Sequence, residues 1–186
     1  MIDSPRFEAL LDQLVHGSTD DPDAKWKAAI ALADAQEPDQ KQHAVSALVQ
    51  VLTGGRAHAL IRAHAVESLG RLGDRRAVPT LIDALRDPYR LVRAYAAGAL
   101  AEVGDPQAID PLLTALEADE FFGVRAEAVA ASALLSKPQS DVVQQRVREA
   151  LVKQREAEIA QSQPGSERVL AEIERALRLL ESREEG

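Results

Sequence analysis

Apolar residues recur at helical spacing in segments that follow each other along the chain. In residues 75–86 the apolar side chains are Val78, Leu81, Ile82 and Leu85. Their separation of three to four residues is that of a helix with one buried face. The pattern therefore predicts an amphipathic helix over these residues.

A second helix is predicted immediately afterwards, over residues 88–103. Pro88 stops the preceding helix and can start the next one. Gly104 is expected to end the second helix in a left-handed conformation. The residues predicted to form its buried stripe are Val92, Ala96, Ala99, Leu100 and Val103.

The pair of helices is a repeating unit. Residues 92–100 repeat the Arg, Ala and Leu pattern of residues 61–69 after 31 positions, and residues 124–128 repeat its opening after a further 32. Residues 108–116 likewise repeat residues 77–85. Two short helices cannot bury their faces alone, so stacking of successive units must supply the core. The sequence thus predicts an all-α solenoid of antiparallel helix pairs.

The N-terminal region is a weaker copy of the unit, with residues 7–15 as its first helix. In the preferred alignment the Arg, Ala and Leu positions are taken by Lys25, Ala28 and Leu32. A rival alignment places Asp21 and Lys27 on the Asp and Arg positions, but it would bury Asp34. Burying an unpaired charge is costly, which favours the first alignment.

The repeat fades after Leu135, where two further helices are predicted. Asp141 is expected to cap a long helix through about residue 160. Ser166 is expected to cap a final helix over residues 166–183. Its apolar stripe consists of Val169, Ile173, Ala176, Leu177 and Leu180.

These segments predict three parts of the chain. The repeat solenoid comprises residues 1–160, and a polar linker comprises residues 161–165. Residues 166–186 form an amphipathic helix that caps the last apolar face; the alternative is that it docks into a groove of a partner.

Composition and charge narrow the function. The chain is rich in Ala and Leu, and only 3% of its residues are aromatic. Its net charge of −8 argues against a sequence-independent grip on nucleic acid and against an anionic membrane surface. It has no cysteine, no apolar run long enough to cross a membrane and no visible secretory leader. We expect a cytoplasmic protein that neither binds nucleic acid nor inserts into membranes.

The repeating unit resembles the HEAT repeat, and more narrowly the short, Ala-rich HEAT-like repeats of the phycobilisome-lyase type. The resemblance is strongest over residues 58–134 and weaker over residues 3–57. It rests on Arg62, Ala65, Leu69, Gly73, Asp74, Ala77, Val78, Pro79, Leu81, Leu85, Asp87, Pro88, Val92 and Arg93.

The resemblance implies a ladder between neighbouring units, formed by the Asp of the turn and the Arg six residues later. Asp87 with Arg93 and Asp119 with Arg125 fit this ladder. The unit of Arg62 departs from it, because Arg56 occupies the Asp position. We therefore interpret Arg62, Arg93 and Arg125 as structural residues.

The resemblance also implies that partners bind the concave face, which the second helix of each unit lines. Residues that occupy equivalent positions in successive repeats should form a row on this face. Lys27 would be the member of the row in the first repeat. Aromatic and Arg side chains are the usual centres of protein interfaces; the alternative is that these are ordinary surface residues. The expected partner-binding residues are Leu60, His64, Glu67, Arg71, Arg90, Leu91, Tyr95, Glu102, Phe122 and Glu127.

No catalytic or metal-binding residues are predicted. The four histidines, His16, His43, His58 and His64, include no i,i+4 pair, and the His-Glu dipeptides of HEAT-like iron hydroxylases are missing. The expected function is thus a non-catalytic adaptor or scaffold that binds another protein without a cofactor.

The alternative function acts on phycobiliproteins. The chain would be a subunit of a phycobilin lyase or isomerase, binding a bilin and a second HEAT-like subunit, or an adaptor in phycobilisome disassembly. Tyr95, His64 and Arg90 could then cradle the bilin and its propionates.

The repeat makes one prediction about stability. Leu100 lies in the best-matched unit, at the position that Leu69 occupies one unit earlier. Leu100→Ala should lower the free energy of unfolding by about 2–5 kcal/mol, because it removes a buried side chain. Denaturant unfolding measures this loss, and an unchanged midpoint would show that the stripe has been misplaced.

Overall fold

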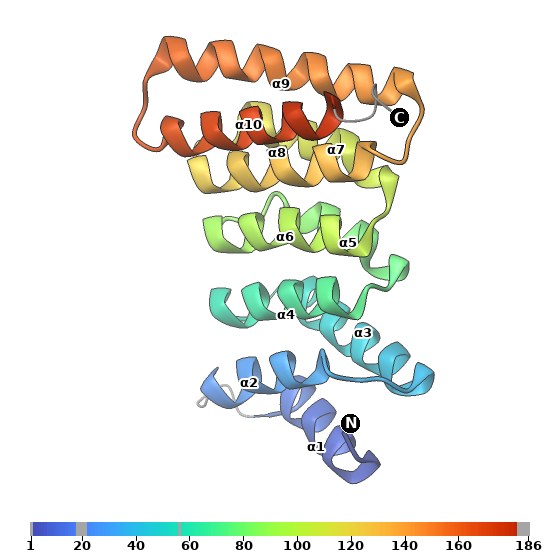
Figure 1. Ribbon diagram of the computed structural model, residues 1–186. Coiled ribbons are helices and arrows are strands. Elements are labelled where there is room, and N and C mark those ends of the chain that lie inside the picture. The colour runs from blue at the N-terminus through green and yellow to red at the C-terminus, as the bar shows by residue number, and fades with distance from the viewer. Residues whose placement is uncertain (1, 18–21, 56, 182–186) are drawn as a thin grey trace. The chain divides into compact units, whose positions relative to one another are not determined.

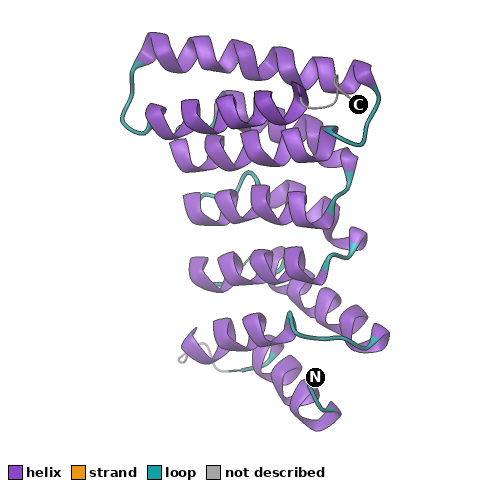
Figure 2. Cartoon of the chain, viewed as in Figure 1, coloured by secondary structure: helices purple, strands orange, loops and turns teal. Residues whose placement is uncertain are grey.

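The computed structural model describes all residues except 1, 18–21, 56 and 182–186. In this part of the chain, helices are joined by short loops and there is no strand (Figure 2). None of the described helices has the length and apolar character to cross a membrane. The predicted all-α fold of stacked helix pairs is confirmed. Arg56, Asp21 and the last residues of the expected final helix lie outside the described residues.

The chain divides into two compact units, residues 1–103 and residues 104–186. In the first unit, one layer of helices contains α2, α4 and α6, and the other contains α1, α3 and α5 (Figure 1). The elements of this unit are α1 (Ser4–Val15), α2 (Pro22–Leu32), α3 (Pro38–Thr53), α4 (Ala59–Leu72), the 3-10 turn η1 (Arg75–Ala77), α5 (Val78–Ala84) and α6 (Arg90–Val103).

The second unit has the same two-layer construction. Within it, α8 packs against α10 and α7 packs against α9. Its elements are the 3-10 turn η2 (Pro106–Ala108), α7 (Ile109–Ala118), α8 (Phe122–Ser136), α9 (Asp141–Gln161) and α10 (Ser166–Glu181). Because α10 stacks on α8 as α6 stacks on α4, α9 and α10 form another helix pair although their sequences have lost the repeat.

The predicted buried stripe of α6 is confirmed, whereas Ile82, expected in the stripe of the preceding helix, is only half-buried. Every residue of the stripe in α6 is buried, and Leu100 is completely inaccessible to solvent. Gly104 has a φ of 76°, the left-handed conformation expected after α6. Asp34 is exposed while Ala28 and Leu32 are buried, as the preferred N-terminal alignment requires.

Two helices begin a few residues away from their predicted starts, because aspartate carboxylates accept hydrogen bonds from the backbone in the preceding turns. The helix expected from residue 75 begins as a 3-10 turn, because the Asp74 carboxylate accepts from the Arg76 backbone N–H. The Asp87 carboxylate accepts from the backbone N–H of Tyr89 at 2.8 Å, so α6 begins at residue 90 rather than 88.

The residues predicted to cap the starts of the last two helices are both corrected. Ser140, not Asp141, is the extended residue that precedes α9. Ser166 is the first residue of α10, and its hydroxyl donates to the Glu158 carboxylate at 2.6 Å. The side chain is therefore used to hold α9 and α10 together.

The stack of second helices depends on small residues at their contacts. A methyl group on Gly70 of α4 would lie 2.8 Å from both Cα and Cβ of Ala99 on α6. A methyl group on Gly98 of α6 would have no neighbouring atom within 4 Å. One glycine therefore permits a close helix contact, whereas the other faces open space.

This contrast predicts opposite effects of the same substitution. Gly70→Ala should lower the free energy of unfolding by about 1–3 kcal/mol, because the Ala99 backbone must move. Gly98→Ala should raise it by about 0.5–1 kcal/mol, because alanine loses less backbone entropy in a helix. Urea unfolding of the two variants tests the helix contact; equal effects would contradict it.

Candidate partner-binding face

Three aromatic rings form a row across the second helices of the first unit. The ring of Trp26 on α2 lies 5.1 Å from that of His64 on α4, measured between centroids. His64 lies 6.5 Å from Tyr95 on α6. We call the surface that carries this row the second-helix face; besides the rings it carries Leu60, Glu67, Arg71, Gly98 and Glu102.

The repeat offsets do not identify Trp26, because they place its neighbour Lys27 in this row. The sequence repeats that contain α2 and α4 are 37 residues apart instead of 31, so the alignment of these two repeats is weaker. The structure places the indole against His64 and the ammonium of Lys27 over the same indole, 5.4 Å from its centroid. The single tryptophan of the chain, beside a lysine, was the available signal.

The expected members of the row in the first unit are largely accessible. Tyr95 is 39% exposed and Leu60 is 42% exposed, whereas His64 and Leu91 are half-buried. The remaining members, Glu67, Arg71, Arg90 and Glu102, are exposed. The second helices thus present aromatic, apolar and charged groups together at one surface.

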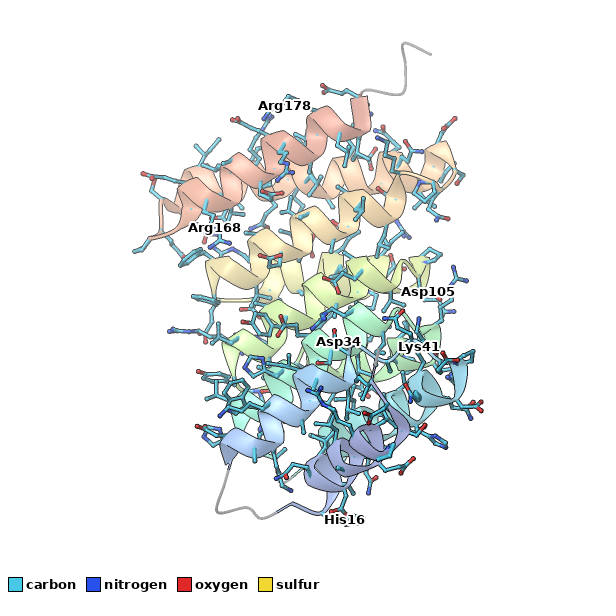
Figure 3. All side chains as sticks on the ribbon, turned by 60° about the horizontal axis from the view of Figure 1, so that its bottom comes forward. His16, Asp34, Lys41, Asp105, Arg168 and Arg178 are labelled. Atoms are coloured by element: carbon cyan, nitrogen blue, oxygen red, sulfur yellow. The ribbon has the colours of Figure 1, made fainter. Side chains whose placement is uncertain are left out.

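Polar contacts hold several of these side chains in place. His64 Nδ1 lies 3.1 Å from Glu67 Oε2, one turn along α4. Arg71 Nη2 lies 2.6 Å from Oδ1 of Asp34, which follows α2 (Figure 3). The indole N–H of Trp26 donates to Asp23 at 3.1 Å. These contacts restrict the conformations that the three side chains can adopt.

Glu102 lies against the neighbouring helix. A methyl group on Gly70 would lie 2.6 Å from Glu102 Oε2, so the carboxylate extends from α6 over the α4 backbone. Burial raises the pKa of Glu102, the negative charge of Glu67 raises it further, and Arg71 opposes the shift. The negative charge at this position is therefore incompletely compensated.

Two arginines contact Asp87, the turn residue of the predicted ladder. The guanidinium of Arg62 donates to both carboxylate oxygens of Asp87, at 2.7 and 2.8 Å, and thereby links α4 to the turn before α6. Arg93 instead donates to the main-chain carbonyl of Asp87 at 2.9 Å. Burial alone would raise the pKa of Asp87, but the hydrogen bonds from Arg62 and from the Tyr89 N–H lower it overall.

In the second unit Arg125 likewise contacts the main chain of the turn residue six positions before it. Arg125 donates to the main-chain carbonyl of Asp119 at 3.0 Å, while its Nε lies 2.6 Å from Oε1 of Glu158 on α9. Ser166 and Gln154 also donate to this carboxylate. Both members of the ion pair are buried, with side chains 7% and 3% exposed.

Phe122 and Glu127, expected in the partner-binding row, lie in the second unit and contact its C-terminal helix pair. Phe122 is half-buried; its ring is 4.9 Å from that of Phe121, and a methyl group on Gly165 would collide with it. Glu127 lies 3.7 Å from Arg168 on α10 (Figure 3). Phe122 is therefore less accessible to solvent than its position in the repeat predicts.

The buried pair predicts a pH-dependent stability. Burial would raise the pKa of Glu158, but hydrogen bonds from Arg125, Ser166 and Gln154 lower it overall. A lowered folded pKa stabilises the fold fully above the unfolded value of about 4.3. The stabilisation is then lost as the pH falls through the lowered folded pKa.

Glu158→Gln should lower the free energy of unfolding at pH 7 by about 3–5 kcal/mol, because it leaves the Arg125 charge buried without a carboxylate. The difference from the wild type should shrink as the pH falls through the lowered folded pKa of Glu158. The control is Glu156→Gln, an exposed change on the same helix that should alter stability by less than about 0.5 kcal/mol. Urea unfolding at pH 7 and pH 3 measures both, and a pH-independent effect of Glu158→Gln would refute the assignment.

Comparison with known protein families matches one of them. The model of HEAT repeats matches residues 45–133, which include α4 to α7 and most of α8. Comparison with curated proteins found no match.

Two solved structures share the fold over nearly the whole chain. One is from the complex of CpcE and CpcF of phycocyanin lyase from Nostoc sp. PCC7120, with 22% identity and a TM-score of 0.64; the match covers 94% of this chain and 99% of that chain. The other is an engineered protein of the Northeast Structural Genomics Consortium, with 20% identity, a TM-score of 0.61 and coverage of 94% and 78%. Residues 45–133 are therefore similar to HEAT repeats, and the chain shares the fold of these two structures.

Proposed function

We propose that the protein is a non-catalytic adaptor or scaffold that binds another protein through its second-helix face. The observation that carries this proposal is the ring row of Trp26, His64 and Tyr95, which spans three stacked helices and ends in an exposed tyrosine. Aromatic side chains supply large contact areas at low entropic cost and dominate protein interfaces.

The structure around the row supports recognition by preformed groups. Ring contacts, the contact of His64 with Glu67 and the ion pair of Arg71 with Asp34 hold the side chains, so little entropy remains to be lost on binding. The Arg62–Asp87 pair fixes α4 relative to the turn that precedes α6. We propose that Leu60, Leu91 and Arg90 extend this interface.

Two tyrosines of the first unit provide a matched test of the interface. Tyr95→Ala should weaken binding of the native partner by about 1–2 kcal/mol or more, as expected for an interface centre. Tyr89→Ala removes a side chain of nearly equal exposure, 37% against 39%, from the turn outside the ring row. It should leave the affinity within about 0.5 kcal/mol of the wild type.

The partner is first isolated by affinity capture from extracts of the source organism, and calorimetry then gives its affinity for each folded variant. Equal affinities for Tyr95→Ala and the wild type would refute the interface. In that case α10 becomes the leading binding element.

A second function is favoured by one observation, the structural likeness to a chain of the CpcE–CpcF complex of phycocyanin lyase. Under this alternative the chain is a subunit of a phycobilin lyase or isomerase, or an adaptor acting on phycobiliproteins. Its own partner would be a phycobiliprotein or a second HEAT-like subunit. His64, Tyr95 and Arg90 would then contact the bilin. Titration with phycocyanobilin, followed by absorbance, separates the two functions, since an adaptor leaves the bilin spectrum unchanged.

A further inference from the structure

The second-helix face lacks a side chain at Gly98 of α6. Gly98 lies one turn after Tyr95 and one turn before Glu102 on α6. No atom lies within 4 Å of the position that a side chain would take at Gly98. At the equivalent position of α4, 31 residues earlier, the chain has Glu67. Tyr95 and Glu102 therefore flank Gly98 along α6, and Glu67 is its counterpart on α4.

Charges on this face are distributed unevenly along the helices. Lys27 lies over Trp26, on the far side of the ring row from α6. Arg90 stands at the first residue of α6, whereas Arg71 lies in the last turn of α4, near Glu102, and is paired with Asp34 at 2.6 Å. Glu67 and Glu102 lie toward the C-terminal ends of α4 and α6, where the helix dipoles add partial negative charge. A cation would be attracted to this end of the face.

The Glu102 carboxylate lies over the α4 backbone at Gly70, where it loses part of its hydration. The negative charge of Glu67, which lies on α4, repels this carboxylate. A bound cation would relieve both the desolvation and the repulsion. The adjacent Tyr95 ring is 39% exposed and offers a flat surface on which a planar cation can stack. Of the two side chains that are always charged at neutral pH, lysine and arginine, only arginine is planar.

We propose that the second-helix face receives an arginine side chain of the partner protein, whose guanidinium lies over Gly98 between the Tyr95 ring and the carboxylates of Glu67 and Glu102. The proposal rests on the proposed function and names the chemistry that the partner presents. Ring stacking and paired carboxylate contacts together distinguish arginine from an apolar side chain and from a neutral polar one.

The probe that tests this proposal is a peptide with three arginines separated by glycines, and its control carries citrulline in place of each arginine. Citrulline keeps the planar shape and removes the charge. Chemical shifts of the isotope-labelled full chain are followed during titration. The arginine peptide should shift the resonances of Tyr95, Gly98 and Glu102, and the citrulline peptide should not. Equal shifts from both peptides, or shifts confined to other residues, would overturn the proposal.

Gly98 also allows a matched pair of charge variants. Gly98→Lys and Gly98→Glu place side chains of similar length in open space, and both replace glycine with a better helix former. Circular dichroism confirms that both are folded. Gly98→Lys should weaken binding of the arginine peptide by about tenfold or more, because it sets a like charge beside the guanidinium. Gly98→Glu should bind at least as tightly as the wild type, and equal weakening by both variants would refute the charge assignment.

The outcomes separate this proposal from the broader one. If Tyr95→Ala weakens the native partner but neither Gly98 variant affects the arginine peptide, the interface stands and the arginine assignment is wrong. If Tyr95→Ala leaves native binding unchanged, the interface itself is wrong, whatever the peptide does.

Discussion

Close stacking of short helices is the constraint on which this structure depends. A helix of about fourteen residues cannot bury enough apolar surface by itself. Small residues make the stacking possible, because they let backbones approach and leave the larger leucines to fill the space between layers. The contact of Gly70 with Ala99 is an example, and Leu69 and Leu100 on the same helices are completely buried.

The arginines act on this stack by setting how one helix pair follows the next. In the first unit, Arg62 joins α4 to the turn before α6 through the Asp87 carboxylate. In the second unit, Arg125 performs the same task through Glu158, a residue of the long helix α9. Because these pairs are partly or fully shielded from water, they resist screening by salt. The Arg62–Asp87 pair therefore helps to hold the second-helix face in a constant arrangement.

The second-helix face follows directly from this construction. Positions separated by one repeat lie side by side on neighbouring helices, so a row of side chains is as regular as the stack itself. His64 and Tyr95 are such equivalents, and their rings are 6.5 Å apart. Where the repeat leaves a glycine, as at Gly98, the row opens. The side chains of this row can thus change by single substitutions that leave the packed side of the helices untouched.

The sequence by itself determined the class of fold, the helix pairs of the best-matched repeats, the buried stripe of α6 and the left-handed turn at Gly104. It also indicated the accessible row of Tyr95, Leu60 and their neighbours. These features follow from local periodicity, because a side chain's position in the helix decides whether it faces the core.

Only the tertiary structure decided which partners the ladder arginines take, that Trp26 joins the ring row, and that α9 and α10 form another stacked pair. These features depend on contacts between residues far apart in the sequence, where the repeat interval changes or ends. Arg125 and Glu158 are 33 residues apart, and no repeat pattern links them. Periodicity carries no information about such pairs, because they are selected by which side chains meet once the helices have packed.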